Sequence, residues 1–248
     1  MPHLKRWHER YSEDGLVIVG VHTPEFDFEK VTDNVESAVK KLGITWPVAM
    51  DNDMATWNAW SNRYWPAEYL VGRDGKVLHH HYGEGRYAET ESAIRSALGL
   101  AASDDAIAEP DFSGIGSPEM YFGTARVGNL INIEVPPQFS HRYAAPEAVP
   151  LNRFALDGTW RLRSEYAELT GSEGLIRLRF RAGKLHMVAA SADAVATLDI
   201  NIDGHVLPSV RIDGSRMYTL FDSDDYGEHV AEIRIHGKGF RAYTFTFG

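Results

Sequence analysis

The sequence contains no cysteine. This absence excludes disulfide bonds, thiolate nucleophiles and zinc–thiolate sites built from the chain's own residues. It does not fix the compartment, because secreted and cytosolic proteins alike can lack cysteine. The 248 residues therefore cannot carry out thiol–disulfide exchange by themselves.

Clustered positive charge and long apolar runs are also scarce. The formal net charge is −10, from 25 Lys and Arg against 35 Asp and Glu. Phosphate binding needs clustered Lys and Arg, so we expect no nucleic-acid partner. The longest apolar runs, such as Leu16–Val21, are far shorter than a bilayer-spanning helix. The start of the chain, Met1–Trp7, has no apolar signal-peptide core, so we expect neither an export signal nor a membrane segment in the chain as given.

The first 100 residues alternate between helical and strand patterns. Apolar spacing predicts helices over 4–11, 26–42, 54–60 and 87–98, and strands over 16–21, 46–50, 67–71 and 77–82. The run Leu16–Val21 is continuously apolar, which is typical of a strand covered on both faces. The Asp-Gly within Arg73–Lys76 predicts a hairpin turn. Residues 1–100 therefore read as an α/β domain whose sheet mixes parallel and antiparallel strands.

The spacing of apolar residues changes after a linker. Residues 101–117 are small, acidic and without any period, which indicates a linker. Further on, apolar residues alternate with polar ones, as in Ile176–Arg181, where every second residue is arginine. Turn signals occur at Asp157-Gly158, Gly171-Ser172, Asp203-Gly204 and Asp213-Gly214. Residues 118–248 therefore predict an antiparallel β-sandwich.

Four motifs in the first half carry a family resemblance. They are Gly15–Phe26, Trp46–Asp51, Arg63–Leu70 and Asp74–Val77. In this order they resemble the thioredoxin-like redoxin family, of the TlpA/DipZ type that serves outside the cytoplasmic membrane.

The second half extends the resemblance over nearly the whole chain. Its motifs are Pro118–Gly123, Leu156–Trp160, Arg177–Ala182 and Ala242–Gly248. They are similar to the C-terminal sandwich of DipZ-type thioredoxins, a domain similar in shape to carbohydrate-binding modules. The resemblance implies an extracytoplasmic thiol–disulfide oxidoreductase, of the kind that acts in cytochrome c maturation or envelope disulfide exchange. Its substrates would be protein thiols and disulfides, and it implies no cofactor.

The family pattern also shows what this chain lacks. Such domains begin with a central strand and a Cys-x-x-Cys motif at the N-terminus of the first long helix, where the helix dipole stabilises a thiolate. Here Met1-Pro2 falls within that helix, so strand, motif and first helical turn are all missing. We therefore expect an N-terminally truncated thioredoxin-like domain with no catalytic residue of its own.

Two interpretations of this truncation stay open. The chain is either part of a longer oxidoreductase, or a short form with a non-redox role. Such a role would be a binding protein whose sandwich recognises a glycan or an envelope protein. In both cases the missing strand leaves backbone groups of two neighbouring strands unpaired and apolar surface exposed. We expect the chain to be unstable, to exchange strands with a partner copy, or to close the gap in another way.

Candidate substrate-binding residues lie in two loops of the first half. The resemblance implies that Trp65-Pro66 is a cis-proline loop presenting backbone groups to a substrate peptide; the alternative is an ordinary proline at a strand entry. Glu25 follows the strand 16–21, at an end of the sheet where ligands gather. We interpret Glu25 either as a proton carrier or as part of a turn that caps a helix. In the run His79–His81 only the outer two share a strand face, so no metal site is predicted.

Aromatic residues of the second half suggest glycan contacts. Tyr226 and Trp160 could stack on sugar rings, and the alternative is that they fill the core of the sandwich. Tyr226 is the more exposed candidate because it lies beside Asp222, Asp224 and Asp225. That acidic loop does not match the spacing of a known calcium loop.

Overall fold

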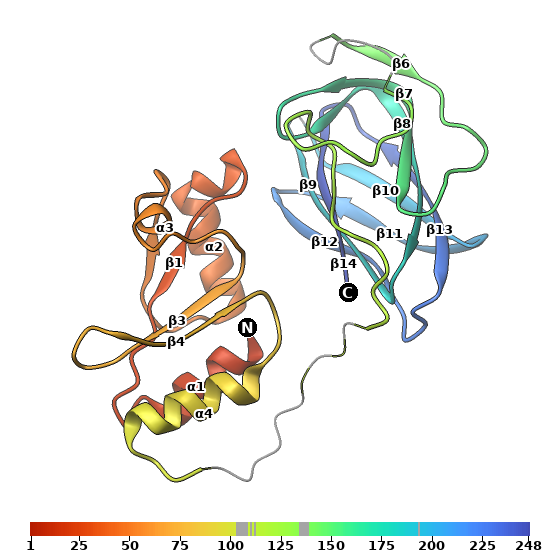
Figure 1. Cartoon of the computed structure of the whole chain (residues 1–248). Helices are drawn as coiled ribbons and strands as arrows, with labels where there is room; N and C mark the ends of the chain where they lie inside the picture. Colours follow the sequence, from red (N-terminus) through yellow and green to blue (C-terminus); the bar gives the residue numbers. More distant parts are fainter. Residues whose placement is uncertain (103–108, 110, 112, 134–138, 193) are drawn as a thin grey trace. The chain divides into compact units, whose positions relative to one another are not determined.

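The computed structural model describes residues 1–248 except 103–108, 110, 112, 134–138 and 193. The chain divides into two compact units, Met1–Pro110 and Asp111–Gly248 (Figure 1). The division falls inside the segment 101–117 that the sequence indicates as a linker, and part of that segment lies outside the described residues. In the part of the chain that is described, no helix has the length and apolar character needed to span a membrane.

The first unit is an α/β unit, as predicted. Its elements are α1 (Pro2–Tyr11), β1 (Gly20–His22), the 3-10 helix η1 (Asp27–Lys30), α2 (Thr32–Leu42), β2 (Val48–Met50), α3 (Ala55–Ala59), β3 (Ala67–Val71), β4 (Val77–Tyr82) and α4 (Tyr87–Leu98). β1 and β2 pair in parallel, whereas β3 and β4 form an antiparallel hairpin. The helix predicted over 26–42 is two helices, because Val31 is extended between them.

The core of the α/β unit lies where α1 packs beside α4 (Figure 1). Its buried apolar members are Trp7, Tyr11, Tyr87 and Ile94. A buried carboxylate completes this core: Glu91 of α4 accepts hydrogen bonds from Trp7 Nε1 at 3.1 Å and from the Tyr11 hydroxyl at 2.5 Å. Leu16 and Leu70 pack against the same cluster. The residues that precede β1 and the end of β3 therefore contact the same pair of helices.

The two sheets of this unit share no ladder. Among the described residues β1 pairs only with β2, and β3 only with β4. Val17, Val19 and Val21 are 78%, 58% and 47% exposed. The prediction that the run 16–21 is covered on both faces is therefore wrong, because nothing described packs over this row of valines. The described part of this unit therefore has strand edges without a pairing partner beside exposed apolar side chains.

The second unit is built of antiparallel β-strands. They are β5 (Met120–Tyr121), β6 (His141–Tyr143), β7 (Arg153–Leu162), β8 (Ala167–Arg181), β9 (Lys184–Ser191), β10 (Ala196–Ile202), β11 (His205–Ile212), β12 (Arg216–Asp222), β13 (Glu228–His236) and β14 (Phe240–Phe247). Seven of them follow the order β11-β10-β13-β8-β14-β9-β12, while β7 pairs with β8 and β6, and β5 with β14. The sheet encloses one apolar core (Figure 1).

The alternation in Ile176–Arg181 is resolved as predicted. Its apolar residues have no exposed surface, and its arginines lie outside the core. Arg177 Nη2 lies 2.6 Å from Glu232 Oε1, and Arg179 Nη2 lies 2.8 Å from Glu228 Oε2 on the neighbouring β13. Cross-strand pairs of opposite charge thus lie on the solvent-facing side of the sheet.

Two predicted turns are wrong. Asp157-Gly158 lies inside β7 and Gly171-Ser172 inside β8, where the register between the two strands shifts. Gly158 has φ +101°, so its glycine serves an irregularity within a strand, as glycines often do at bulges. The turns at Asp203-Gly204 and Asp213-Gly214 are confirmed, since each lies between consecutive strands.

Candidate functional site

The candidate site of the α/β unit is the loop that leads into β3. Trp65-Pro66 is a cis peptide, which confirms the predicted cis-proline. Trp65 Nε1 donates a hydrogen bond of 3.2 Å to the carbonyl of Thr23, just beyond the carboxyl end of β1. On the other side, the amide of Gly83 donates to the carbonyl of Pro66 at 2.8 Å. The loop is therefore held between the end of β1 and the segment before α4.

A buried tryptophan of α3 packs against this loop. The Trp57 ring of α3 lies 4.1 Å from the Trp65 ring, centroid to centroid, and is itself buried. Trp65 remains 49% exposed and Tyr64 58% exposed. The carbonyl of Tyr64 accepts a hydrogen bond of 2.9 Å from Asn62 Nδ2, which fixes the backbone before the proline. The loop is therefore held by its backbone and presents the exposed aromatic side chains of Tyr64 and Trp65. Contiguous exposed apolar patches often mark interaction sites.

Asp51 anchors the segment that carries Trp57. Its carboxylate accepts the amides of Thr56 at 2.8 Å and Trp57 at 2.9 Å, and the Thr23 hydroxyl at 3.1 Å. Burial opposes ionisation here, but these hydrogen bonds dominate and lower the pKa of Asp51. The Asp51 carboxylate therefore accepts two amides at the start of α3.

Glu25 lies in the turn between β1 and η1. Its amide donates to Glu29 Oε2 at 2.6 Å, and the Phe26 amide donates to the same oxygen at 3.2 Å. The carboxylate that accepts these two amides is that of Glu29, within the 3-10 helix itself. Glu25 lies in the turn just before this helix, and its role stays a prediction. The nearby His22 Nε2 lies 3.0 Å from the carbonyl of Glu29, which gives it a structural partner.

Two partly satisfied polar groups lie on β3 and β4, close to the loop. Glu68 and His81 face each other in the strand register. Neither Glu68 Oε2 nor His81 Nε2 has a hydrogen-bond partner among the described residues, and both atoms are buried. Burial raises the pKa of Glu68, and the neighbouring His81 opposes this rise.

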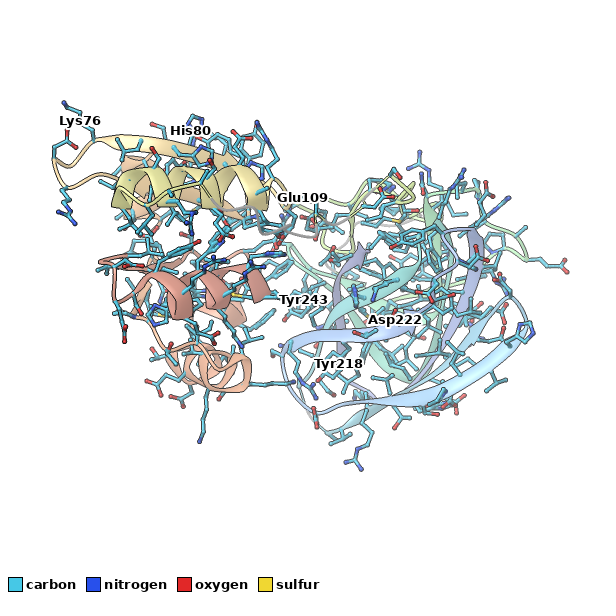
Figure 2. The ribbon with its side chains drawn as sticks, turned by 90° about the horizontal axis from the view of Figure 1, so that it is seen from below. Lys76, His80, Glu109, Tyr218, Asp222 and Tyr243 are labelled. Atoms are coloured by element: carbon cyan, nitrogen blue, oxygen red, sulfur yellow. The ribbon has the colours of Figure 1, made fainter. Side chains whose placement is uncertain are left out.

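The histidine run on β4 divides as the strand period predicts. His79 Nε2 lies 3.4 Å from the Thr90 hydroxyl of α4. The ring of His80, which is labelled in Figure 2, lies 5.2 Å from the Tyr82 ring, centroid to centroid. Within the described residues, no three His, Asp or Glu side chains converge in a way that could hold a metal ion.

The glycan candidates of the β unit differ in their surroundings. Trp160 has no exposed surface, and its Nε1 donates to the carbonyl of Asp157 at 2.8 Å. This placement fits the core interpretation and does not support a sugar contact. Tyr226 is partly exposed, but a Cβ built at Gly114 would lie 2.5 Å from its ring. One face of the Tyr226 ring therefore already packs on the backbone.

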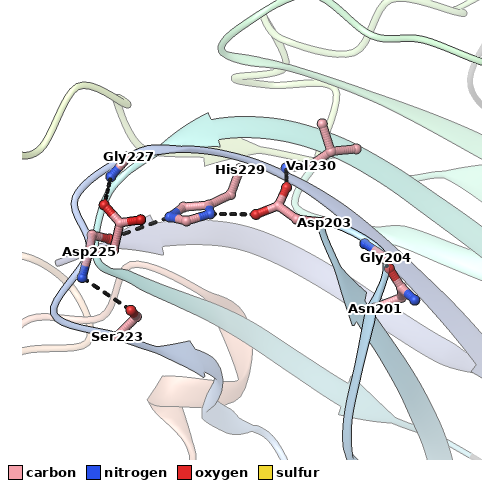
Figure 3. Close-up of polar contacts among 8 residues, drawn as sticks. All are labelled: Asn201, Asp203, Gly204, Ser223, Asp225, Gly227, His229 and Val230. Atoms are coloured by element: carbon pink, nitrogen blue, oxygen red, sulfur yellow. Dashed lines mark hydrogen bonds and ion pairs between the residues drawn. The ribbon is translucent and has the colours of Figure 1, made fainter.

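The acidic loop beside Tyr226 is held by a histidine (Figure 3). Nδ1 of the buried His229 lies 2.7 Å from Oδ2 of Asp203, and its Nε2 lies 3.3 Å from the carbonyl of Asp225. Asp203 also accepts the Val230 amide at 2.7 Å. Burial would raise the pKa of Asp203, but the His229 and Val230 hydrogen bonds outweigh it and lower the pKa.

This arrangement predicts a pH-dependent effect of Asp203→Asn. A carboxyl with a depressed folded-state pKa stabilises the protein above its unfolded pKa, and this stability is lost as the pH falls through the folded pKa. We expect the substitution to cost about 1 kcal/mol at pH 7 and progressively less below pH 4. Thermal unfolding of both proteins across this range measures it. A cost that stays constant with pH would contradict the assignment.

Comparison with known proteins places both units in a family. Residues 117–248 match the family model of the thioredoxin-like C-terminal domain. Protein DipZ of Mycobacterium tuberculosis is 33% identical over 256 residues, which cover 100% of this chain and 36% of DipZ. The chain thus spans about a third of the length of this relative.

Two further relatives match shorter parts of the chain. NHL repeat-containing protein 2 of Homo sapiens is 40% identical over 86 residues, 34% of this chain and 12% of that protein. Thiol-disulfide oxidoreductase YkuV of Bacillus subtilis is 26% identical over 98 residues, 40% of this chain and 66% of its own length.

Proposed function

Because the chain belongs to the thioredoxin-like redoxin family, we propose that it supplies the protein-docking part of an extracytoplasmic thiol–disulfide exchange system. The observation that carries this proposal is the cis Trp65-Pro66 loop, which is exposed yet fixed at the end of β1. An extended peptide can align its backbone with such a loop at the entry of a strand. The reacting thiols come from other polypeptide segments, because this chain has none.

We also propose that the α/β unit is a thioredoxin-like domain with a place for one more strand between β1 and β3. Support comes from their unpaired edges and from the exposed valines of the segment 17–21. An added strand would pair with both edges and cover apolar surface, and each effect is favourable. Sedimentation of the full chain tests whether partner copies exchange strands, because such exchange requires at least a dimer.

Peptide docking can be measured directly on the full chain. The probe is an uncharged, end-blocked peptide with one cysteine in an extended apolar sequence. We expect it to cause saturable NMR shifts in the Trp65 indole N–H and in the amides of Ala67 and Gly83. Trp65→Ala should weaken binding about tenfold or more, because exposed aromatic anchors dominate such interfaces.

The matched control is Leu78→Ala, an exposed apolar residue on β4 near the far end of the hairpin. It should bind the peptide like the unchanged chain. The proposal fails if the peptide causes no saturable shifts near Pro66, or if Trp65→Ala binds as well as the control. The chain alone should not reduce insulin, whatever the outcome.

The β unit enters this proposal as a docking module. Glycan recognition is the alternative, and Tyr226 is its remaining candidate, with one ring face occupied as described. A glycan array probed with the full chain tests it, and Tyr226→Ala should abolish any signal.

A further inference from the structure

Glu68 and His81 form a buried polar pair next to the Trp65-Pro66 loop. The two residues are directly opposed in the register of β3 and β4, so both side chains point to one face of the hairpin with Cβ atoms about 4.5–5.5 Å apart. α4 lies on that face, since its Thr90 hydroxyl is 3.4 Å from Nε2 of His79, two residues before His81. His81 is 9% exposed and Thr90 4% exposed. The pair is therefore enclosed between the hairpin and a helix.

The pair lacks hydrogen bonds that buried groups normally have. Glu68 Oε2 and His81 Nε2 are both buried, and neither has a partner among the described residues. Buried polar groups are nearly always paired, because burying one without a partner costs free energy. A proton shared between the two opposed side chains would give both atoms a partner at once. Loss of that proton leaves a buried carboxylate without a donor.

The surroundings of Glu68 favour the protonated pair. Burial raises the pKa of Glu68 more than His81 and Thr90 lower it. Glu68 therefore keeps its proton to a higher pH than an exposed glutamate does. The charged or titratable groups that face the same space are His79 and His81 of β4, Glu84, Tyr87 of α4 and the amino group of Met1.

A movement of this pair reaches the Trp65-Pro66 loop through short connections. Only Ala67 lies between Pro66 and Glu68, and it pairs with Tyr82, the residue after His81. The carbonyl of Pro66 accepts the amide of Gly83 at 2.8 Å. Each of the two strands that hold the loop thus carries one member of the pair within two residues of the hydrogen bond to Pro66.

We propose that Glu68 and His81 are a buried proton switch that controls how firmly the Trp65-Pro66 loop is held. With one proton shared between the two side chains, the hairpin packs on α4 as it does in the structure. When the pair loses this proton, the Glu68 carboxylate has to reach water, and the start of β3 moves away from α4. The switch itself is independent of the proposed docking function, whereas its effect on docking rests on that function.

The switch predicts how the stability of the chain depends on pH. A carboxyl with a raised folded-state pKa stabilises the protein fully below its unfolded pKa, about 4.3 for glutamate, and this stability is lost as the pH rises through the folded pKa. Glutamine has the shape of a protonated glutamate and cannot lose a proton. Relative to the unchanged chain, Glu68→Gln should therefore raise the ratio of folded to unfolded protein about tenfold between about pH 4 and about pH 8.

Urea unfolding followed by tryptophan fluorescence measures this ratio at each pH. Glu9→Gln, an exposed change on α1, is the matched control and should show no such trend. An advantage of Glu68→Gln that stays the same at every pH would contradict the switch.

NMR titration of the full chain tests the sharing of the proton. The Glu68 carboxyl carbon should titrate above the ordinary value for glutamate, and the amides of Ala67 and Gly83 should shift with the same midpoint. Glu68→Gln should abolish this transition in both amides. His81→Gln should move the Glu68 midpoint upward, because a group that opposes the rise is removed. The inference is overturned if Glu68 titrates at its ordinary value, if the two amides do not follow it, or if His81→Gln leaves its midpoint unchanged.

The effect on docking is measured with the extended peptide described above, with serine in place of its cysteine so that the probe has no titrating group. Its affinity should fall about threefold or more as the pH rises through the Glu68 midpoint, and it should stay constant in Glu68→Gln. If the peptide binds at no pH, the docking function fails and the titration alone decides the switch. An affinity of the unchanged chain that stays constant across the Glu68 midpoint would show that the pair does not control the loop.

Discussion

Replacing Glu91 by leucine should lower the free energy of unfolding of the α/β unit by about 3–5 kcal/mol. The carboxylate is only 3% exposed and accepts hydrogen bonds from Trp7 and Tyr11, with Arg10 Nη1 at 3.4 Å. Leucine has similar bulk but no acceptor, so the two buried donors of Trp7 and Tyr11 lose this acceptor at once. Leaving such donors unsatisfied costs more than the hydrogen bonds themselves contribute.

Tryptophan fluorescence during urea unfolding measures this effect selectively. Five of the six tryptophans lie in the α/β unit, so the signal reports mainly on that unit. Glu89→Leu is the matched control, because Glu89 lies on the same helix with a side chain 48% exposed. It should change the stability by no more than about 0.5 kcal/mol. Equal midpoints for the two variants would mean that Glu91 does not hold α1 and α4 together.

The Glu91 contacts illustrate which parts of the fold the sequence could predict. The helix predicted over 87–98 has the bounds of α4, because apolar spacing and the following glycine are local signals. The partner of Glu91 is not a local signal, since Trp7 lies 84 positions away. The two wrong turns have a similar cause: glycine suits a turn and a strand irregularity equally, and only the pairing of β7 with β8 decides between them.

The candidate site was predictable to a similar extent. The cis peptide at Trp65-Pro66 followed from the family resemblance, because the motif around it is contiguous in sequence. The support from Trp57 and the tie to Thr23 required folded geometry, since these contacts join separate elements. The contact of Glu109 with the Ala88 amide gave no signal at all: in the sequence Glu109 is one acidic residue in an acidic linker, and the contact joins residues 21 positions apart.

Replacing Gly123 by alanine should destabilise the β unit by about 3 kcal/mol or more. A Cβ at this position would lie 2.2 Å from the carbonyl carbon of Glu165 and 2.4 Å from the carbonyl oxygen of Ser164. These atoms belong to the backbone, so no rotamer change relieves the overlap. The neighbouring hydrogen bonds, from Thr124 to the carbonyl of Arg163 and from Ala125 to that of Ser164, hold the two segments in close approach. The methyl group must therefore separate segments that cover the core at Phe122.

Gly128→Ala is the matched control for this prediction, since a Cβ at Gly128 meets nothing within 4 Å among the described residues and its φ is not positive. Alanine there should be neutral or slightly stabilising, because it reduces the conformational entropy of the unfolded chain. Calorimetry and amide hydrogen exchange in β5 and β14 measure both variants without relying on the single tryptophan of this unit. Faster exchange in Gly123→Ala alone is the expected result, because β5 pairs with β14 directly beside the place where Gly123 approaches Ser164 and Glu165. Equal protection from hydrogen exchange in the two variants would show that the segments around Gly123 and Glu165 can move apart without loss of packing.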